Sequence, residues 1–183
     1  MTPTLLCLRR FTVIDVSTPS SPSAVAVLQD GQNSMTRLND PTQILIREID
    51  GGYYAFIAAY TDSAVQIADV STPSSPTSAS NSLVYTSSTY VETYNPYAIT
   101  LFTLRDITGR EEITVLIATG YTGDGYDVFD VSDPTAPYYM AVDTSEVNGP
   151  RGISEFIDPS TGLQCIFVCG NIGNDCHVQS ITS

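Results

Sequence analysis

The chain has 183 residues, with 20 acidic and 7 basic side chains and a formal net charge of -13 at pH 7. That length leaves room for one domain with a full-sized core. The acidic excess disfavours binding to the phosphates of nucleic acids or docking to an anionic membrane. Because 42% of the residues are apolar and stand in organised runs, disorder is excluded as well. We expect one globular domain over residues 1–183, with no nucleic-acid partner.

Residues 1–10 hold a short apolar stretch that is followed by two arginines, without a small-residue cleavage site. This pattern does not predict a signal peptide. No run in the chain approaches the roughly 18 apolar residues that span a bilayer, so membrane insertion is not expected. The protein is predicted to be soluble, or secreted by a signal already removed.

The predicted strands fall into four units along the chain. The first unit, residues 1–30, is a partial blade with a short second strand, a third and a fourth at 4–8, 11–14 and 23–28. The second, residues 40–84, has four strands at 43–49, 53–60, 64–70 and 77–84. The third, within 97–142, has four at 97–105, 112–119, 126–131 and 138–142. The last, residues 151–183, is a partial blade with strands at 152–157, 164–169 and 176–181.

Turn residues separate all these segments, and no stretch shows the 3.6-residue period of an amphipathic helix. The second and third strands of each complete unit are apolar almost without interruption, which is typical of strands covered on both faces. The sequence therefore predicts an all-β, β-propeller-like domain, with two complete four-stranded antiparallel blades flanked by two partial blades.

A turn motif, Asp-Val-Ser-x-Pro-x-x-Pro, recurs at the end of the third strand in three units. Its repeated residues are Asp15, Pro19 and Pro22, then Asp69, Pro73 and Pro76, then Asp130, Pro134 and Pro137. Recurrence of the aspartate could indicate a ring of metal-binding or acid-base carboxylates. The favoured interpretation is turn chemistry, in which each carboxylate accepts nearby backbone N–H groups.

The motif and the strand before it, best preserved at residues 65–76 and less completely at 13–22 and 128–137, resemble the LVIVD-repeat β-propeller family. The resemblance covers nearly the whole chain at the level of the repeat. It implies a propeller fold and often a cell-surface or extracellular setting, and it carries over no catalytic residues. Propellers of that family usually hold more blades than this chain supplies.

Two groups of residues are candidate metal sites. Asp124, Asp127 and Asp130 could form a calcium cluster, but their spacing is not that of an EF-hand loop. The second candidate is a thiolate site that combines the only histidine, His177, with three cysteines, Cys165, Cys169 and Cys176. Structural roles are favoured for both groups. We expect no metal, no cofactor and no catalytic residue, because no nucleophile or nucleotide-binding motif is present.

The four cysteines are predicted to form two disulfides, with four buried free thiols as the alternative. Cys169 and Cys176 bracket a turn-rich loop between two strands, so their sulfurs could face each other across a hairpin. Cys7 and Cys165 occupy the second strand of the first and last units. They would meet only if the two partial blades meet, within a chain or between chains.

Serine and threonine gather with proline in the repeated turns. Their hydroxyl groups are candidate O-glycan carriers in a secreted protein, and solvated connections between blades are the simpler interpretation. The candidates are Ser17, Thr18, Ser20, Ser21, Ser71, Thr72, Ser74 and Ser75. A cluster of tyrosines could line a sugar-binding rim, although ordinary strand packing is favoured: Tyr85, Tyr90, Tyr94 and Tyr97.

Three classes of function follow from this architecture. The leading expectation is a non-enzymatic extracellular or surface structural protein. Its incomplete terminal blades would join copies of itself into a closed oligomer or a filament. The alternative is a propeller module that binds a glycan or a protein, and the third is an enzyme acting on polysaccharide.

Overall fold

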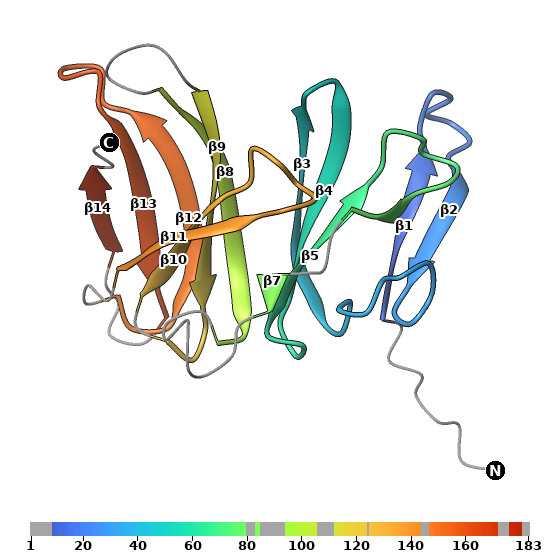
Figure 1. Ribbon diagram of the computed structural model, residues 1–183, viewed down its shortest axis with the longest axis horizontal. Coiled ribbons are helices and arrows are strands. Elements are labelled where there is room, and N and C mark those ends of the chain that lie inside the picture. The colour runs from blue at the N-terminus through green and yellow to red at the C-terminus, as the bar shows by residue number, and fades with distance from the viewer. Residues whose placement is uncertain are drawn as a thin grey trace.

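The computed structural model describes residues 9–79, 83–84, 94–105, 112–123, 125–143, 147–171 and 176–180. All regular structure within these ranges is β-strand, in four antiparallel sheets that we name A to D in chain order. The sheets stand side by side, with sheet A on the right of Figure 1 and sheet D on the left. The all-β, blade-like prediction is confirmed.

Each sheet is built from strands that follow one another in the chain. Sheet A pairs β1 (Arg10–Asp15) with β2 (Ser23–Gln29). Sheet B holds β3 (Pro41–Ile49), β4 (Gly52–Ala59), β5 (Ala64–Asp69), β6 (Thr77–Ser78) and β7 (Leu83–Val84). Sheet C holds β8 (Pro96–Arg105), β9 (Glu112–Gly120), β10 (Tyr126–Asp130) and β11 (Tyr138–Asp143). Sheet D holds β12 (Pro150–Ile157), β13 (Gln164–Gly170) and β14 (Cys176–Ser180).

The outer strand of sheet B differs from the prediction of one continuous strand over 77–84. Two short strands, β6 and β7, pair with opposite ends of β5. The sequence between them is rich in serine and has no β-branched or aromatic residue, so it offers little side-chain packing to a sheet. The sheet therefore keeps the order of a four-stranded meander, with its last strand divided into β6 and β7.

Three hydrophobic clusters join the sheets in order. The first joins sheets A and B through Leu28, Ala55, Ile57 and Ala68. The second, around Phe56, Ile67, Leu116 and Phe129, joins sheets B and C. The third joins sheets C and D, with Val115, Ile117, Ile166 and Val168 at its centre. Sheets B and C thus each have one face toward the preceding sheet and one toward the following sheet, as in the blades of a propeller.

A second repeated feature begins the inner strand of sheets B, C and D. Asp40, Asn95 and Gly149 have φ of 59°, 57° and 59°, and a proline follows each of them. Aspartate, asparagine and glycine are the residues that best tolerate this left-handed conformation. The carbonyls of all three accept a backbone hydrogen bond from the residue that follows the second strand. We call Asp40, Asn95 and Gly149 the strand entries, because each fixes where the first, inner strand of its sheet starts: β3, β8 and β12.

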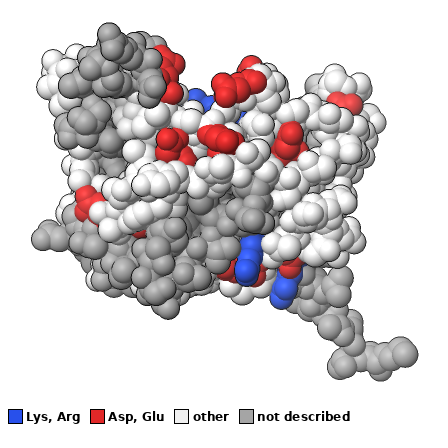
Figure 2. Space-filling view, viewed as in Figure 1, with Lys and Arg blue, Asp and Glu red and all other residues white. Residues whose placement is uncertain are grey.

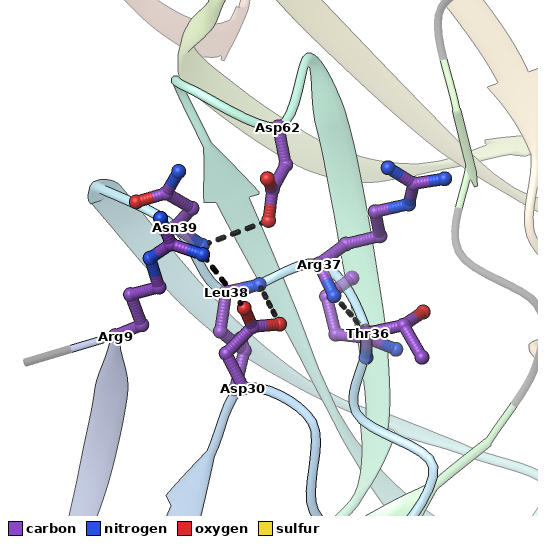
Figure 3. A network of polar contacts seen from close by, with 8 residues as sticks. Arg9, Asp30, Thr36, Arg37, Leu38, Asn39 and Asp62 are labelled. Carbon is purple, nitrogen blue, oxygen red and sulfur yellow. Dashed lines mark hydrogen bonds and ion pairs between the residues drawn. The ribbon is translucent and has the colours of Figure 1, made fainter.

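Residues 30–40, which connect sheet A to sheet B, are held by polar contacts (Figure 3). The Gln66 side chain is fully buried, and its Oε1 accepts the backbone N–H groups of Thr36 and Arg37, each at 3.2 Å. The Asp62 carboxylate accepts the N–H of Asn39 at 2.9 Å. These contacts seat Leu38, which is fully buried, between the two sheets.

Replacing Gln66 with Leu is expected to lower the free energy of unfolding by about 2–4 kcal/mol, because two backbone N–H groups lose their acceptor. Urea denaturation followed by circular dichroism would measure the loss. Gln32→Leu is the matched control, because it makes the same substitution at an exposed glutamine. A leucine variant as stable as the original chain would show that these bonds contribute nothing.

Candidate interaction surfaces

The three motif aspartates make the same local hydrogen bond. Each Oδ1 accepts the backbone N–H of the serine two residues later, at 2.8 Å for Asp15, 2.9 Å for Asp69 and 2.8 Å for Asp130. At Asp15 the backbone N–H and side chain of Ser17 hold the pKa of the carboxyl below its usual value. These carboxylates are thus engaged in turns.

The motif serine then ties the turn to the neighbouring strand. Ser71 Oγ accepts the N–H of Tyr53, and Ser132 Oγ accepts that of Thr114, each at 2.9 Å. A backbone bond closes the following turn in all three units, with proline as its second residue. All the repeated prolines lie in these connections, which join the third strand to the fourth.

The repeat gives an internal reference for the outer face of sheet A. Ile14, Ala68 and Phe129 stand at the same place, directly before the motif aspartate. Ala68 and Phe129 are 0% and 1% exposed, because each packs against the preceding sheet. Ile14 is 55% exposed, because no described sheet packs in front of sheet A. This open surface, the A face, consists of the exposed side chains Ile14, Val16, Val25 and Val27.

Sheet D has its opposite face open. The strand register places Phe167 of β13 where Phe56 stands in β4. Phe56 is 0% exposed because it packs toward sheet C, whereas Phe167 is 40% exposed. Its cross-strand partner Val178 corresponds to Ile67, and these two are 59% and 0% exposed. The D face consists of Phe156, Phe167 and Val178.

Two of the cysteines lie on the same side of sheet D as Phe167. Cys169 of β13 is directly opposite Cys176 of β14, and their sulfurs are 2.8 Å apart. Hydrogen bonding to Cys176 raises the pKa of the Cys169 thiol. Cys165 is buried on β13, and its proposed partner Cys7 lies outside the described residues. The structure records the three described cysteines as thiols, and both predicted disulfides stay predictions.

We expect oxidation to join Cys169 to Cys176, because they already face each other across a short hairpin. Closing this small loop should raise the free energy of unfolding by about 2–3 kcal/mol. Peptide mapping without reduction should recover the linked peptides, and reduction should remove the gain in stability. A Cys176→Ser variant that responds to reductant exactly as the original chain does would contradict this pairing.

Neither metal candidate is assembled by the described residues. His177 pairs with Val168 and alternates with Cys176 along β14, so its side chain lies on the opposite side of the sheet from the two facing thiols. Asp127 is fully buried, Asp130 bonds to Ser132, and Asp124 lies outside the described residues. In the ranges that the structure covers, no group of three metal-ligating side chains converges.

The eight candidate O-glycan residues all lie on exposed parts of the two N-terminal turns. Of the four tyrosines considered for a sugar-binding rim, Tyr85 and Tyr90 lie outside the described residues. Tyr97 is half-buried in an aromatic group with Tyr60 and Tyr121 that sequence analysis did not single out. Tyr60 and Tyr121 each follow the second strand of their sheet and Tyr97 lies in β8, so the group joins sheets B and C and depends on how these sheets pack.

Comparison with known proteins finds one family. The LVIVD repeat family matches residues 9–29 and 50–83, which include β1, β2 and the strands from β4 to β6. No curated protein matches the chain. Among the described residues, no helix has the length and hydropathy needed to cross a bilayer.

Proposed function

We propose that this chain, which matches the LVIVD repeat family over residues 9–29 and 50–83 and packs its four sheets face to face, is a structural protein whose copies continue the same stack. The A face of one copy would cover the D face of another. One observation carries the proposal: positions that are buried between sheets inside the chain are exposed at both ends of the stack, as at Phe56 and Phe167.

A second copy fits these faces for a geometric reason. We call the side of a sheet that faces the next sheet in the chain its following side, and the opposite side its preceding side. Inside the chain, the following side of one sheet packs on the preceding side of the next. The D face is a following side and the A face is a preceding side, so one chain presents both halves of the contact. Contacts of this head-to-tail kind produce rings when the rotation closes and filaments when it does not.

Charge directs association toward these faces. Figure 2 shows one flank of the stack with acidic side chains concentrated in its upper half, and the chain as a whole carries a net charge of -13. Like charge on the flanks opposes lateral packing of copies. The A and D faces are apolar, and burying such patches favours association.

The proposed role is non-enzymatic and located outside the cell or at its surface. The exposed hydroxyl groups of the repeated turns and the facing pair Cys169 and Cys176 suit an oxidising, extracellular setting. The second of these turns, at Ser71, Thr72, Ser74 and Ser75, follows β5 of sheet B, which lies inside the stack and contributes nothing to the A or D face. Glycans carried on this second turn would therefore leave assembly unhindered.

Light scattering coupled to size exclusion tests the proposal on the 183-residue chain. At micromolar concentration we expect particles of several times 19.7 kDa, which dissociate on dilution. Electron microscopy then distinguishes rings from filaments. A single species of 19.7 kDa across the concentration range would refute self-assembly.

A further inference from the structure

The aromatic group at the end of the stack where the inner strands begin includes a stacked arginine. Tyr60 follows β4, Tyr97 lies in β8, Tyr121 follows β9 and Arg151 lies in β12. The guanidinium carbon of Arg151 is 4.2 Å from the centroid of the Tyr121 ring and 5.1 Å from that of Tyr97. The Tyr60 ring packs against both of the other rings, at 6.3 and 5.8 Å. Three sheets thus contribute to one small surface.

The backbone around this surface is fixed by the repeated strand entries. Asn95, in the left-handed conformation, precedes Pro96 and Tyr97, and its side-chain amide donates to the Tyr60 carbonyl at 2.9 Å. Gly149, in the same conformation, precedes Pro150 and Arg151. Each entry is followed by proline, which restricts φ further. The rings and the guanidinium are therefore held in place before any ligand arrives.

Arg151 differs from other arginines in how it uses its N–H groups. Arg9 pairs with Asp30 at 3.4 Å, and Arg47 donates to the Leu101 carbonyl at 2.5 Å. Arg151 makes only its ring contacts among the described residues, and its side chain is exposed. Stacking occupies the flat face of a guanidinium and leaves the N–H groups along its edge open.

We propose that Tyr60, Tyr97, Tyr121 and Arg151 bind the carboxylate of an acidic sugar. A guanidinium held flat on aromatic rings offers a planar pair of donors that matches a carboxylate. The three tyrosines of this group also carry phenolic hydroxyl groups, which can exchange hydrogen bonds with sugar hydroxyls. A sugar ring offers carboxylate and hydroxyls together, whereas an acidic peptide side chain offers the carboxylate alone.

This site is independent of the proposed assembly. Its residues come from sheets B, C and D, and none of them belongs to the A face or the D face. The chain's net charge of -13 repels anions in general, so an acidic ligand must be held by specific donors at short range. Binding should accordingly persist at physiological salt.

Titration calorimetry of the full chain with trigalacturonate tests the proposal, and maltotriose serves as the neutral probe. We expect trigalacturonate to bind at least about tenfold more tightly, since the charged hydrogen bonds are made only by the carboxylate. Arg151→Gln should lose that preference. Arg151→Lys should recover part of it, because lysine keeps the charge and loses the planar fork. Arg9→Gln, which removes an arginine elsewhere, should leave binding unchanged.

Tyr121→Leu removes the ring that lies closest to the Arg151 guanidinium and leaves the net charge unchanged. It should weaken trigalacturonate binding. Thermal unfolding of each variant establishes that it is folded. Equal affinity for the two sugars, unchanged binding by Arg151→Gln in a folded chain, or no binding of trigalacturonate at millimolar concentration would each overturn the proposal. None of these outcomes bears on whether copies stack through the A and D faces.

Discussion

Replacing Ile14 with Asp is expected to convert the assembled protein to single chains of 19.7 kDa. Ile14 lies at the centre of the A face, and its equivalent Phe129 is 1% exposed in the contact between sheets B and C. An aspartate in such a contact would be buried without a partner, at a cost of at least about 3 kcal/mol. That cost weakens association more than about a hundredfold.

Tyr138→Asp is the matched control for this prediction. Tyr138 is 70% exposed in β11, outside the A and D faces, so the variant adds the same charge to the surface and should still assemble. Light scattering compares the two variants at equal concentration. If Ile14→Asp assembles as the original chain does, the A face is not the contact.

Phe56→Ala is expected to lower the free energy of unfolding by about 3–5 kcal/mol, whereas Phe167→Ala should lower it by less than about 2 kcal/mol. The two phenylalanines stand at the same place of the repeat. Phe56 fills the contact between sheets B and C, and its removal leaves a cavity that the sheets cannot close. Phe167 is 40% exposed, so much of its ring is already in water.

Urea denaturation should compare both variants in the Ile14→Asp background, so that assembly does not contribute to the measured stability. In the assembling chain, the difference between the two losses of stability should shrink, because Phe167→Ala then also weakens the contact between copies. Similar losses for both variants in the single chain would mean that Phe167 is buried in solution, and that the D face is not open.

Much of the architecture could be predicted because it follows from local patterns repeated along the chain. Strand positions follow from apolar runs bounded by turn residues, and three copies of one turn motif mark equivalent places. The divided outer strand of sheet B was missed, because a run such as 77–84 does not reveal which of its residues pair with β5. Strand pairing depends on the partner as well as on the segment itself.

A second repeat escaped sequence analysis although its signal was present. Asp40, Asn95 and Gly149 differ in residue type, so the three entries do not look alike as letters. What they share is tolerance of positive φ and the proline that follows, a physical likeness that spacing would have revealed. The same spacing places Tyr97 and Arg151 two residues after Asn95 and Gly149, but it does not reveal that their side chains stack, because that contact depends on how neighbouring sheets pack.

The order of the faces gives the proposed array a direction. Since each sheet has a preceding and a following side, every copy added to a filament would point the same way, and the two tips would differ. One tip would always present an A face and the other a D face. A chain with an altered A face and an intact D face could still join the tip that offers an A face, but it would then present its altered A face and stop growth at that tip. A chain with an altered D face would instead join the tip that offers a D face and stop growth there, so each kind of variant would block elongation at one tip and leave the other tip free to grow.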